Sequence, residues 1–141
     1  LRLLDAADRP SGALRDRLID KGYDDETVAA VVDRLIEVGL VDDESYAQSA
    51  VRYCVGRLMG YRGAVMELAR KGVDRPLAER VCDEARMSGV FEDAAWELGR
   101  RSAAKTQGMN PKVRKRRFWS SGGRKGHDAE TLRAVAHELF D

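Results

Sequence analysis

The feature that most constrains the fold of this 141-residue chain is an internal repeat with a period near fifty residues. The pattern Lys-Gly-x-Asp occurs at residues 21–24, again at 71–74 and a third time at 125–128. Agreement extends beyond this pattern, since Gly-Leu-Val-Asp-Asp at residues 39–43 matches Gly-Val-Phe-Glu-Asp at 89–93. A period of this length is typical of stacked supersecondary units, each of which buries too little surface to be stable alone. The repeat therefore predicts three similar units.

Each unit is predicted to contain three helices. The aspartate of the repeated pattern is a candidate N-cap, because apolar residues at helical spacing follow it in the first and third copies. In the middle copy, Pro76 marks the same helix start two residues after Asp74. A shorter helix is expected before each pattern, over residues 11–21, 61–71 and 111–120. No segment alternates between apolar and polar residues for long, so we expect no strands.

A longer helix is expected to open each of the later units. Asp43 and Asp93 are the predicted caps of these helices, while Gly56 and Gly99 inside them indicate either bends or early ends. In the first unit only the end of such a helix, over residues 1–7, is present. The prediction is an all-α fold of nine helices: three tandem three-helix repeats stacked into an elongated, curved array. We divide the chain into repeats at residues 1–42, 43–92 and 93–141.

The third repeat departs from the period by four residues. Leu18, Leu68 and Phe118 lie fifty residues apart and are predicted to be equivalent core positions, whereas the third Lys-Gly turn comes four residues late. We place the insertion near the Ser-Ser-Gly-Gly of residues 120–123. Leu68 should be buried between the helices of the middle repeat.

Composition narrows the class of protein further. Charged residues make up 35% of the chain and hydrophobic residues 43%, which is typical of a folded globular protein. No run approaches the ~18 apolar residues that a membrane span needs. Cys54 and Cys82 lack the spacing of a zinc site, and we expect buried thiols in a cytoplasmic protein. Because the chain begins with Leu1 and not Met, we expect that residues preceding it have been removed.

No feature of the sequence indicates an enzyme. His127 and His137 have no cysteine or carboxylate partner at motif spacing, and no phosphate-binding loop, hydrolase or zinc-protease motif is present. The acidic groups at residues 24–26, 42–44 and 92–93 lie at predicted helix starts, where negative charge is favoured, so we interpret them as caps. We therefore expect no catalytic residues, no metal and no cofactor.

Charge is distributed unevenly along the chain. Residues 1–99 carry 14 Lys/Arg against 20 Asp/Glu, whereas residues 100–141 carry 11 against 4. Between residues 100 and 127 there are ten basic residues and no acidic one, and the four consecutive basic residues 114–117 would cover every side of a helix. Such a segment favours a polyanionic partner, with Phe118-Trp119 available to stack on a base. The alternative is a solvated basic helix whose two aromatic residues lie in the core.

An ordered set of residues in the first two repeats resembles the signature of the RecX regulatory protein family. It comprises GLVDDESYA at residues 39–47, Arg52 and Arg57, and ELARKGV at residues 67–73, preceded by the leucines and the Lys-Gly-Tyr of residues 14–23. The family is similar to the chain in being built of three tandem three-helix repeats. In the third repeat the likeness is looser, because the four-residue insertion follows Phe118-Trp119 where the family continues directly to its turn.

The resemblance implies a regulator that binds the RecA recombinase filament on single-stranded DNA. Recombination, ATP hydrolysis and co-protease activity would all fall, without catalysis by the regulator, which we expect to be a monomer. The runner-up hypothesis is a stand-alone DNA-binding protein that uses one helix-turn-helix-like hairpin, although the hairpins contain few Asn or Gln residues for base readout. The expected partner-binding residues are Arg57, Arg62, Arg101, Lys105, Lys112, Arg114, Lys115, Arg116, Arg117, Arg124 and Lys125.

Overall fold

The computed structural model describes residues 9–141, and this part of the chain forms eight α-helices and contains no strand. The helix expected at residues 1–7 lies outside the described residues. The all-α prediction is confirmed, and the other eight helices occur where expected. They are α2 (Ser11–Asp20), α3 (Asp25–Glu37), α4 (Asp43–Gly56), α5 (Tyr61–Arg70), α6 (Arg75–Met87), α7 (Val90–Lys105), α8 (Pro111–Arg124) and α9 (Ala129–Phe140).

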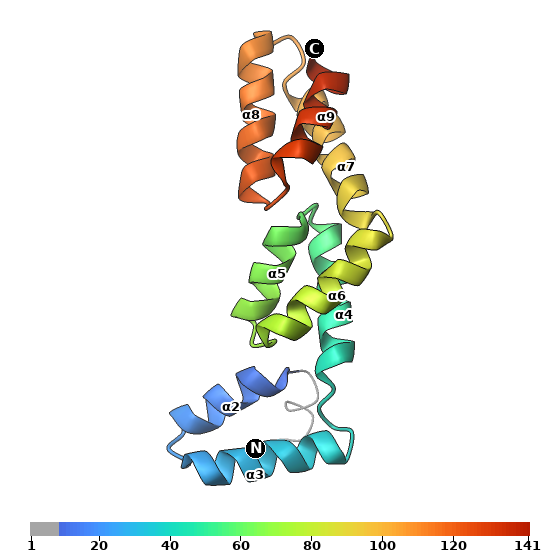
Figure 1. Ribbon diagram of the computed structural model, residues 1–141. Helices are drawn as coiled ribbons and strands as arrows, with labels where there is room; N and C mark the ends of the chain where they lie inside the picture. Colours follow the sequence, from blue (N-terminus) through green and yellow to red (C-terminus); the bar gives the residue numbers. More distant parts are fainter. Residues whose placement is uncertain (1–8) are drawn as a thin grey trace.

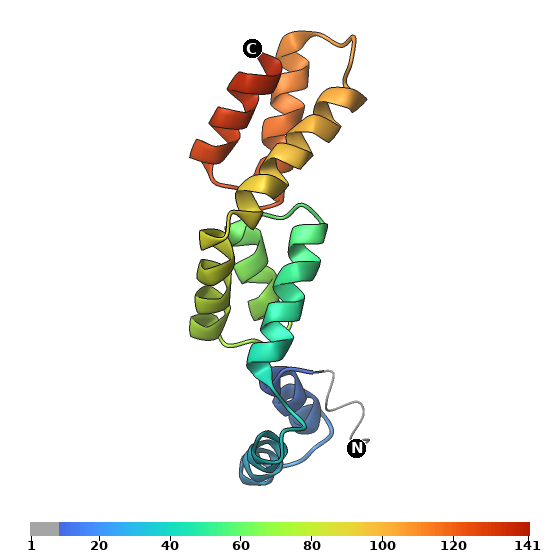
Figure 2. The same ribbon diagram turned by 90° about the vertical axis from the view of Figure 1, so that its right-hand side faces the viewer.

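The helices are stacked in three groups along one axis, which gives the molecule an elongated shape (Figures 1 and 2). We call α2 and α3 the N-terminal unit, α4 to α6 the middle unit, and α7 to α9 the C-terminal unit. Each has its own buried hydrophobic cluster, drawn from residues 14–41, 47–91 and 95–140 respectively. The buried surface is thus divided among three small cores rather than gathered into one.

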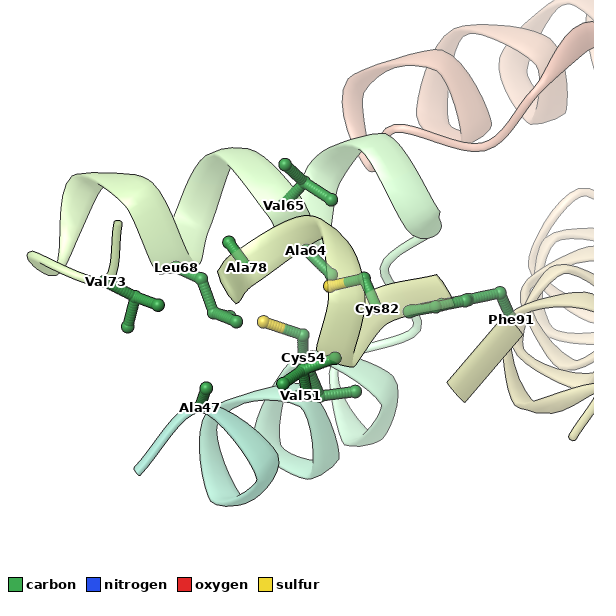
Figure 3. Packing of buried hydrophobic residues seen from close by; sticks show 11 residues of the cluster. Ala47, Val51, Cys54, Ala64, Val65, Leu68, Val73, Ala78, Cys82 and Phe91 are labelled. Atoms are coloured by element: carbon green, nitrogen blue, oxygen red, sulfur yellow. The ribbon is translucent and has the colours of Figure 1, made fainter. Parts of the chain in front are cut away.

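The middle core lies between α4, α5 and α6 and also includes Phe91 from the start of α7 (Figure 3). Leu68 is fully buried there, which confirms its predicted core position. Cys54 and Cys82 are buried in the same cluster and both are free thiols. Burial raises the pKa of both thiols, that of Cys82 to about 12. Both side chains therefore act as small apolar groups that fill the core.

The Lys-Gly turns end the short helices in a left-handed backbone conformation. Gly22, Gly72 and Gly126 have φ values of 98°, 104° and 83°, which a residue with a Cβ adopts only at a cost. The aspartate of each pattern then caps the next helix, as predicted. The acceptor–donor pairs are Asp24 with the Thr27 amide at 2.7 Å, Asp74 with the Leu77 amide at 2.9 Å, and Asp128 with the Thr131 amide at 2.7 Å.

The predicted caps of the two long helices are wrong. Asp42, not Asp43, caps α4, because its backbone is extended and its carboxylate accepts a hydrogen bond from the Ser45 amide at 3.0 Å. Helix α7 follows directly on Gly89 and begins at Val90, so Asp93 lies inside its first turn rather than before it. There its charge still favours the helix start, although its side chain caps nothing.

The two glycines of the long helices have different roles. Gly56 is the last residue of α4, where the helix ends. Gly99 lies within α7, and a Cβ at this position would be 2.5 Å from Cγ1 of Val135 on α9. The glycine in α7 therefore lets two helices of the C-terminal unit approach each other closely, and it does not end the helix.

The four-residue insertion extends a helix instead of forming a loop. Helix α8 has 14 residues where α2 and α5 have 10, so its predicted end at Ser120 is wrong by one turn. Phe118 and Gly122, four residues apart, are both buried on the same side. A Cβ on Gly122 would collide with the side chain of Leu132, which occupies the space a larger residue would take.

Candidate functional site

The middle and C-terminal units meet where the start of α5 faces the turn between α8 and α9. The Gly60 amide donates a hydrogen bond to the Lys125 carbonyl at 2.8 Å. A Cβ on Gly60 would lie 2.6 Å from the backbone of His127, and one on Gly126 would collide with Gly63. Only glycine on both sides lets the two backbones come this close. We call this contact the C-terminal junction.

Side chains from the same turn bind the end of α4. The Lys125 ammonium donates to the carbonyl of Arg57, and Nε2 of His127 lies against the carbonyl of Leu58, each at 2.8 Å. Because a carbonyl can only accept, Nε2 must carry the hydrogen. His127 is only 8% exposed, and burial holds the pKa of its ring below the usual value. Leu58 has a φ of 63° and packs against the C-terminal core.

Beside this junction lies a cleft of about 550 Å³. It is bounded by the end of α4, one side of α7, and α8 with the turn that follows it. No described residue that lines it carries a carboxylate. Its charged lining residues are all cationic, namely Arg57, Arg101, Lys105, Arg117 and Lys125. Like charges gathered at a concave surface raise the local potential and favour a polyanion.

The cations of this cleft differ in the groups of the protein that already contact them. Arg101 pairs with Glu97 at 3.0 Å, and Arg57 lies over the ring of Tyr53, 5.8 Å from its centroid. Within residues 9–141, Lys105 and Arg117 form no ion pair. Those two side chains are therefore the cations most available to an incoming anion.

The structure brings five of the eleven predicted partner-binding residues into the cleft and leaves the others outside. Arg124 lies next to it, in a smaller depression that shares Arg57 and Lys125 with the cleft. Arg62, Lys112 and Arg116 are exposed elsewhere on the surface. Lys115 forms an ion pair with Asp141.

Arg114, also among the predicted partner-binding residues, makes contacts within the C-terminal unit. Its Nε donates to Oγ1 of Thr106 at 3.1 Å, and its Nη2 to the carbonyl of Ala103 at 3.0 Å. The guanidinium also lies over the ring of Phe140, 5.3 Å from the centroid. Arg114 thus joins the end of α7 to α8 and α9, unlike Lys105 and Arg117, whose charged groups have no such contact within residues 9–141.

The two aromatic residues behind the basic run belong to the C-terminal core. Phe118 is fully buried and stacks on Phe140, with ring centroids 5.4 Å apart. Trp119 is partly buried against the same cluster. The predicted stacking of Phe118 on a base is therefore wrong, because the ring has no exposed face. The residues that line the cleft include no aromatic side chain.

Sequence reasoning missed the polar groups that line the cleft between its cations. Ser102 on α7 and Ser121 on α8 are both lining residues. Single serines carry no pattern that would separate them from other surface residues, so only the packing of α7 against α8 shows their place. In residues 9–141 there is no group of three or more potential metal ligands, and none of the helices there has the length and hydrophobicity to cross a bilayer.

The fold places the chain in the class of all-α proteins built from stacked helical units. A family model for the first three-helix domain of RecX matches residues 1–35. The "Regulatory protein RecX" of Thermobifida fusca (strain YX) is 38% identical over 143 residues, which cover 99% of this chain and 76% of that protein. The chain therefore belongs to the RecX family of regulatory proteins.

Another relative shares a shorter segment, and two solved structures share the fold. The protein of the same name from Mycobacterium sp. (strain JLS) is 49% identical over 77 residues, or 52% of this chain and 41% of that one. The crystal structure of RecX from Lactobacillus salivarius superimposes with a TM-score of 0.80 at 20% identity, covering 93% of this chain and 85% of that chain. A second, titled as regulatory protein RecX, gives 0.77 at 18% identity over 92% and 65%.

Proposed function

We propose that this protein binds the RecA recombinase filament on single-stranded DNA and inhibits its strand exchange, ATP hydrolysis and co-protease activity. It would act as a monomer in the cytoplasm, with no chemistry of its own. The proposal rests on membership of the RecX family together with what the resemblance of the sequence implies for that family. One observation on the molecule supports it most: the cleft at the C-terminal junction is lined by five cations and by no carboxylate of the described residues.

The shape of the molecule suggests how a protein without catalytic groups can inhibit a filament. A recombinase filament is a polymer of identical subunits, and ATP turnover requires neighbouring subunits to move relative to each other. An elongated stack of helices can contact two subunits at once and restrain that movement. The charge asymmetry fits such a contact, because the basic C-terminal unit can face DNA while the acidic first 99 residues, with 14 Lys/Arg against 20 Asp/Glu, face basic protein surfaces.

The direct test measures ATP hydrolysis by RecA filaments on single-stranded DNA while this protein is titrated in. The cleft variant Lys105→Glu with Arg117→Glu changes the two cleft cations whose side chains form no ion pair, hydrogen bond or ring contact within residues 9–141. The matched control, Lys112→Glu with Arg116→Glu, changes the same charge on exposed residues of the same unit outside the cleft. We expect the cleft variant to need at least about tenfold more protein for half-inhibition, as for the loss of two charge contacts, and the control to stay close to wild type.

Circular dichroism of both variants establishes that the fold is intact. A well-folded cleft variant that inhibits like the wild type would contradict the proposal that the cleft contacts the filament. Equal loss in both variants would also contradict it, because total charge rather than this site would then decide the affinity. Inhibition that weakens steeply with added salt is expected if phosphates are contacted.

A further inference from the structure

The cations of the cleft come from both sides of the C-terminal junction. Arg57 belongs to the middle unit, at the end of α4, whereas Arg101, Lys105, Arg117 and Lys125 belong to the C-terminal unit. A ligand that contacts all of them must touch both units together. The cleft is therefore a place where binding and the relative position of two units can be coupled.

The free protein holds these like charges near one another at a cost. The backbone contacts of the junction must overcome the repulsion between Arg57 and the four cations of the C-terminal unit, which is modest in water but grows as the cleft excludes solvent. A bound anion attracts the cations of both units, so the electrostatic contribution to closing the junction becomes favourable. The closed arrangement of the junction is therefore more stable when an anionic ligand is bound than it is in the free protein.

The size and chemistry of the cleft identify the class of ligand. A volume of about 550 Å³ is in the range of sites that enclose a small molecule or a short part of a chain. Ser102 and Ser121 add hydroxyl donors between the cations, and hydroxyl, lysine and arginine donors are the usual partners of phosphate oxygens. With its buried aromatic residues, the cleft offers contacts to a sugar-phosphate backbone and not to bases.

We propose that the cleft binds neighbouring phosphates of a single strand of nucleic acid, and that the bound strand locks the middle unit against the C-terminal unit. This inference rests on the proposed function, since it names the ligand of the same site. The single strand is the form that the proposed function brings to this protein, and its flexible backbone can follow the cations of the cleft. The strand acts as a clamp because opening the junction would carry Arg57 away from the phosphates held by the other four cations.

One backbone amide reports the state of the junction directly. The Gly60 amide donates to the carbonyl of Lys125 across the two units, so its hydrogen exchange requires the junction to open. The experiment measures exchange at Gly60 in the full chain at low salt without RecA, with an oligothymidylate of about eight nucleotides as the probe. A ligand at 100 times its Kd that binds only the closed form slows the exchange by roughly a hundredfold.

Two variants of the middle unit test the clamp. Arg57→Gln removes the only cleft cation of that unit but keeps the backbone carbonyl that accepts from Lys125. We expect the oligonucleotide to bind this variant more weakly, with a salt slope reduced by about 0.7, and to protect Gly60 at least about tenfold less than in the wild type. Arg75→Gln, an exposed arginine of the same unit outside the cleft, should match the wild type in both measurements.

Three results would overturn the inference. The first is an oligonucleotide that binds the wild type while exchange at Gly60 is unchanged. The second is equal protection of Gly60 in Arg57→Gln and in the wild type. The third is inorganic tripolyphosphate that protects Gly60 as well as the oligonucleotide at equal phosphate concentration, because the site would then be for small polyphosphates. Filament inhibition is measured separately. Inhibition of the filament without protection of Gly60 would support the proposed function and contradict the clamp. Protection of Gly60 without inhibition would support the clamp and contradict the proposed function.

Discussion

The two junctions of the stack share the same backbone contact but differ in the polar side chains around it. In each, the start of a short helix lies against the Lys-Gly turn of the next unit. At the N-terminal junction, which we define as the contact between α2 and the turn after α5, a Cβ on Gly12 would collide with Gly72, and one on Gly72 would lie 2.5 Å from the Ala13 amide nitrogen. At the C-terminal junction, a Cβ on Gly126 would collide with Gly63, and one on Gly63 would collide with the carbonyl of Lys125.

The difference lies in the side chains around that contact. At the N-terminal junction, the Asp43 carboxylate accepts hydrogen bonds from the amide and hydroxyl of Ser11, at 2.7 and 2.5 Å, and so caps the start of α2. At the C-terminal junction, Lys125 and His127 donate to carbonyls at the end of α4. The Asp43 carboxylate at a helix start and the Lys125 ammonium at a helix end each match the helix dipole. The repeat keeps the backbone geometry and leaves the charge free to differ, and the cationic cleft lies at the C-terminal junction.

The largest effect on stability is expected from adding a methyl group to Gly126 at the C-terminal junction. Gly126→Ala combines a left-handed backbone with a collision against Gly63, so we expect a loss of roughly 2–5 kcal/mol in the free energy of unfolding. Gly22→Ala is the matched control, because its φ is similar but no atom lies within 4 Å of the added Cβ; it should cost only about 1 kcal/mol. Urea unfolding of both variants measures the difference, and equal losses would show that the glycine serves the turn alone.

A smaller effect is expected at the N-terminal junction. Asp43→Ala removes both hydrogen bonds to Ser11 and leaves the start of α2 uncapped, which should cost about 1–2 kcal/mol. Hydrogen exchange should speed up in α2 and stay unchanged at Gly60 of the other junction. Glu44→Ala, which removes an exposed neighbour paired with Arg80, should lie within about 0.5 kcal/mol of wild type. Faster exchange throughout the chain would show that the two junctions do not open independently.

The two junctions should also respond differently to pH. Burial lowers the pKa of His127, an effect that Lys125 reinforces and Asp128 opposes. The unfolded chain therefore takes up a proton more readily than the folded one, so the contribution of His127 is fully present above about pH 6.5 and is lost as pH falls below that value. Exchange at Gly60, corrected for its intrinsic pH dependence, should accelerate between about pH 7 and pH 5.5, whereas exchange at Ser11 should not.

Two histidine variants separate this effect from general acid destabilisation. His127→Gln keeps a donor for the carbonyl of Leu58 but cannot titrate, so the acceleration at Gly60 should disappear. His137→Gln changes an exposed histidine near the end of the chain and should behave like the wild type. An acceleration that persists in His127→Gln would assign the pH dependence to the carboxylates.

The smallest effect on stability is expected from the cleft itself. Lys105→Gln removes a cation that forms no ion pair within residues 9–141, so the free energy of unfolding should stay within about 0.5 kcal/mol of wild type or rise slightly as repulsion falls. Thermal unfolding without ligand measures this. A marked loss of stability would mean that Lys105 holds the C-terminal junction together, and that the cleft is part of the structure rather than a binding site.

The sequence predicted the local features well, because they depend on residues close to one another. The period near fifty, the apolar spacing and the Lys-Gly-x-Asp turns located eight helices and three of their caps, and placed Leu68 in a core. The start of α7 could not be predicted from the repeat. Helix α4 begins at Asp43, which corresponds to Asp93, whereas α7 begins three residues earlier, at Val90.

The cleft was beyond sequence reasoning for a different reason. Its cations come from α4, α7, α8 and the turn after α8, and no local pattern joins them. Their meeting depends on how the middle unit lies on the C-terminal unit, which Gly60 and Gly126 decide. Arg114 and Arg117 stand three residues apart in one basic run, yet one bonds inward and the other faces the cleft, because the neighbouring helices determine which side of α8 is covered.

The extra turn of α8 has a consequence for how such an array can change in length. Four residues advance a helix by about 400°, so everything beyond the insertion is rotated by only about 40° and moved about 6 Å along the axis. The apolar and cationic sides of α8 therefore stay nearly in phase on either side of the added turn, and Gly122 absorbs the remaining crowding against Leu132. Two added residues would rotate the following segment by about 200° and turn its charges toward the core. A helix of this array can therefore lengthen by one turn while its buried and its exposed sides keep nearly the same directions.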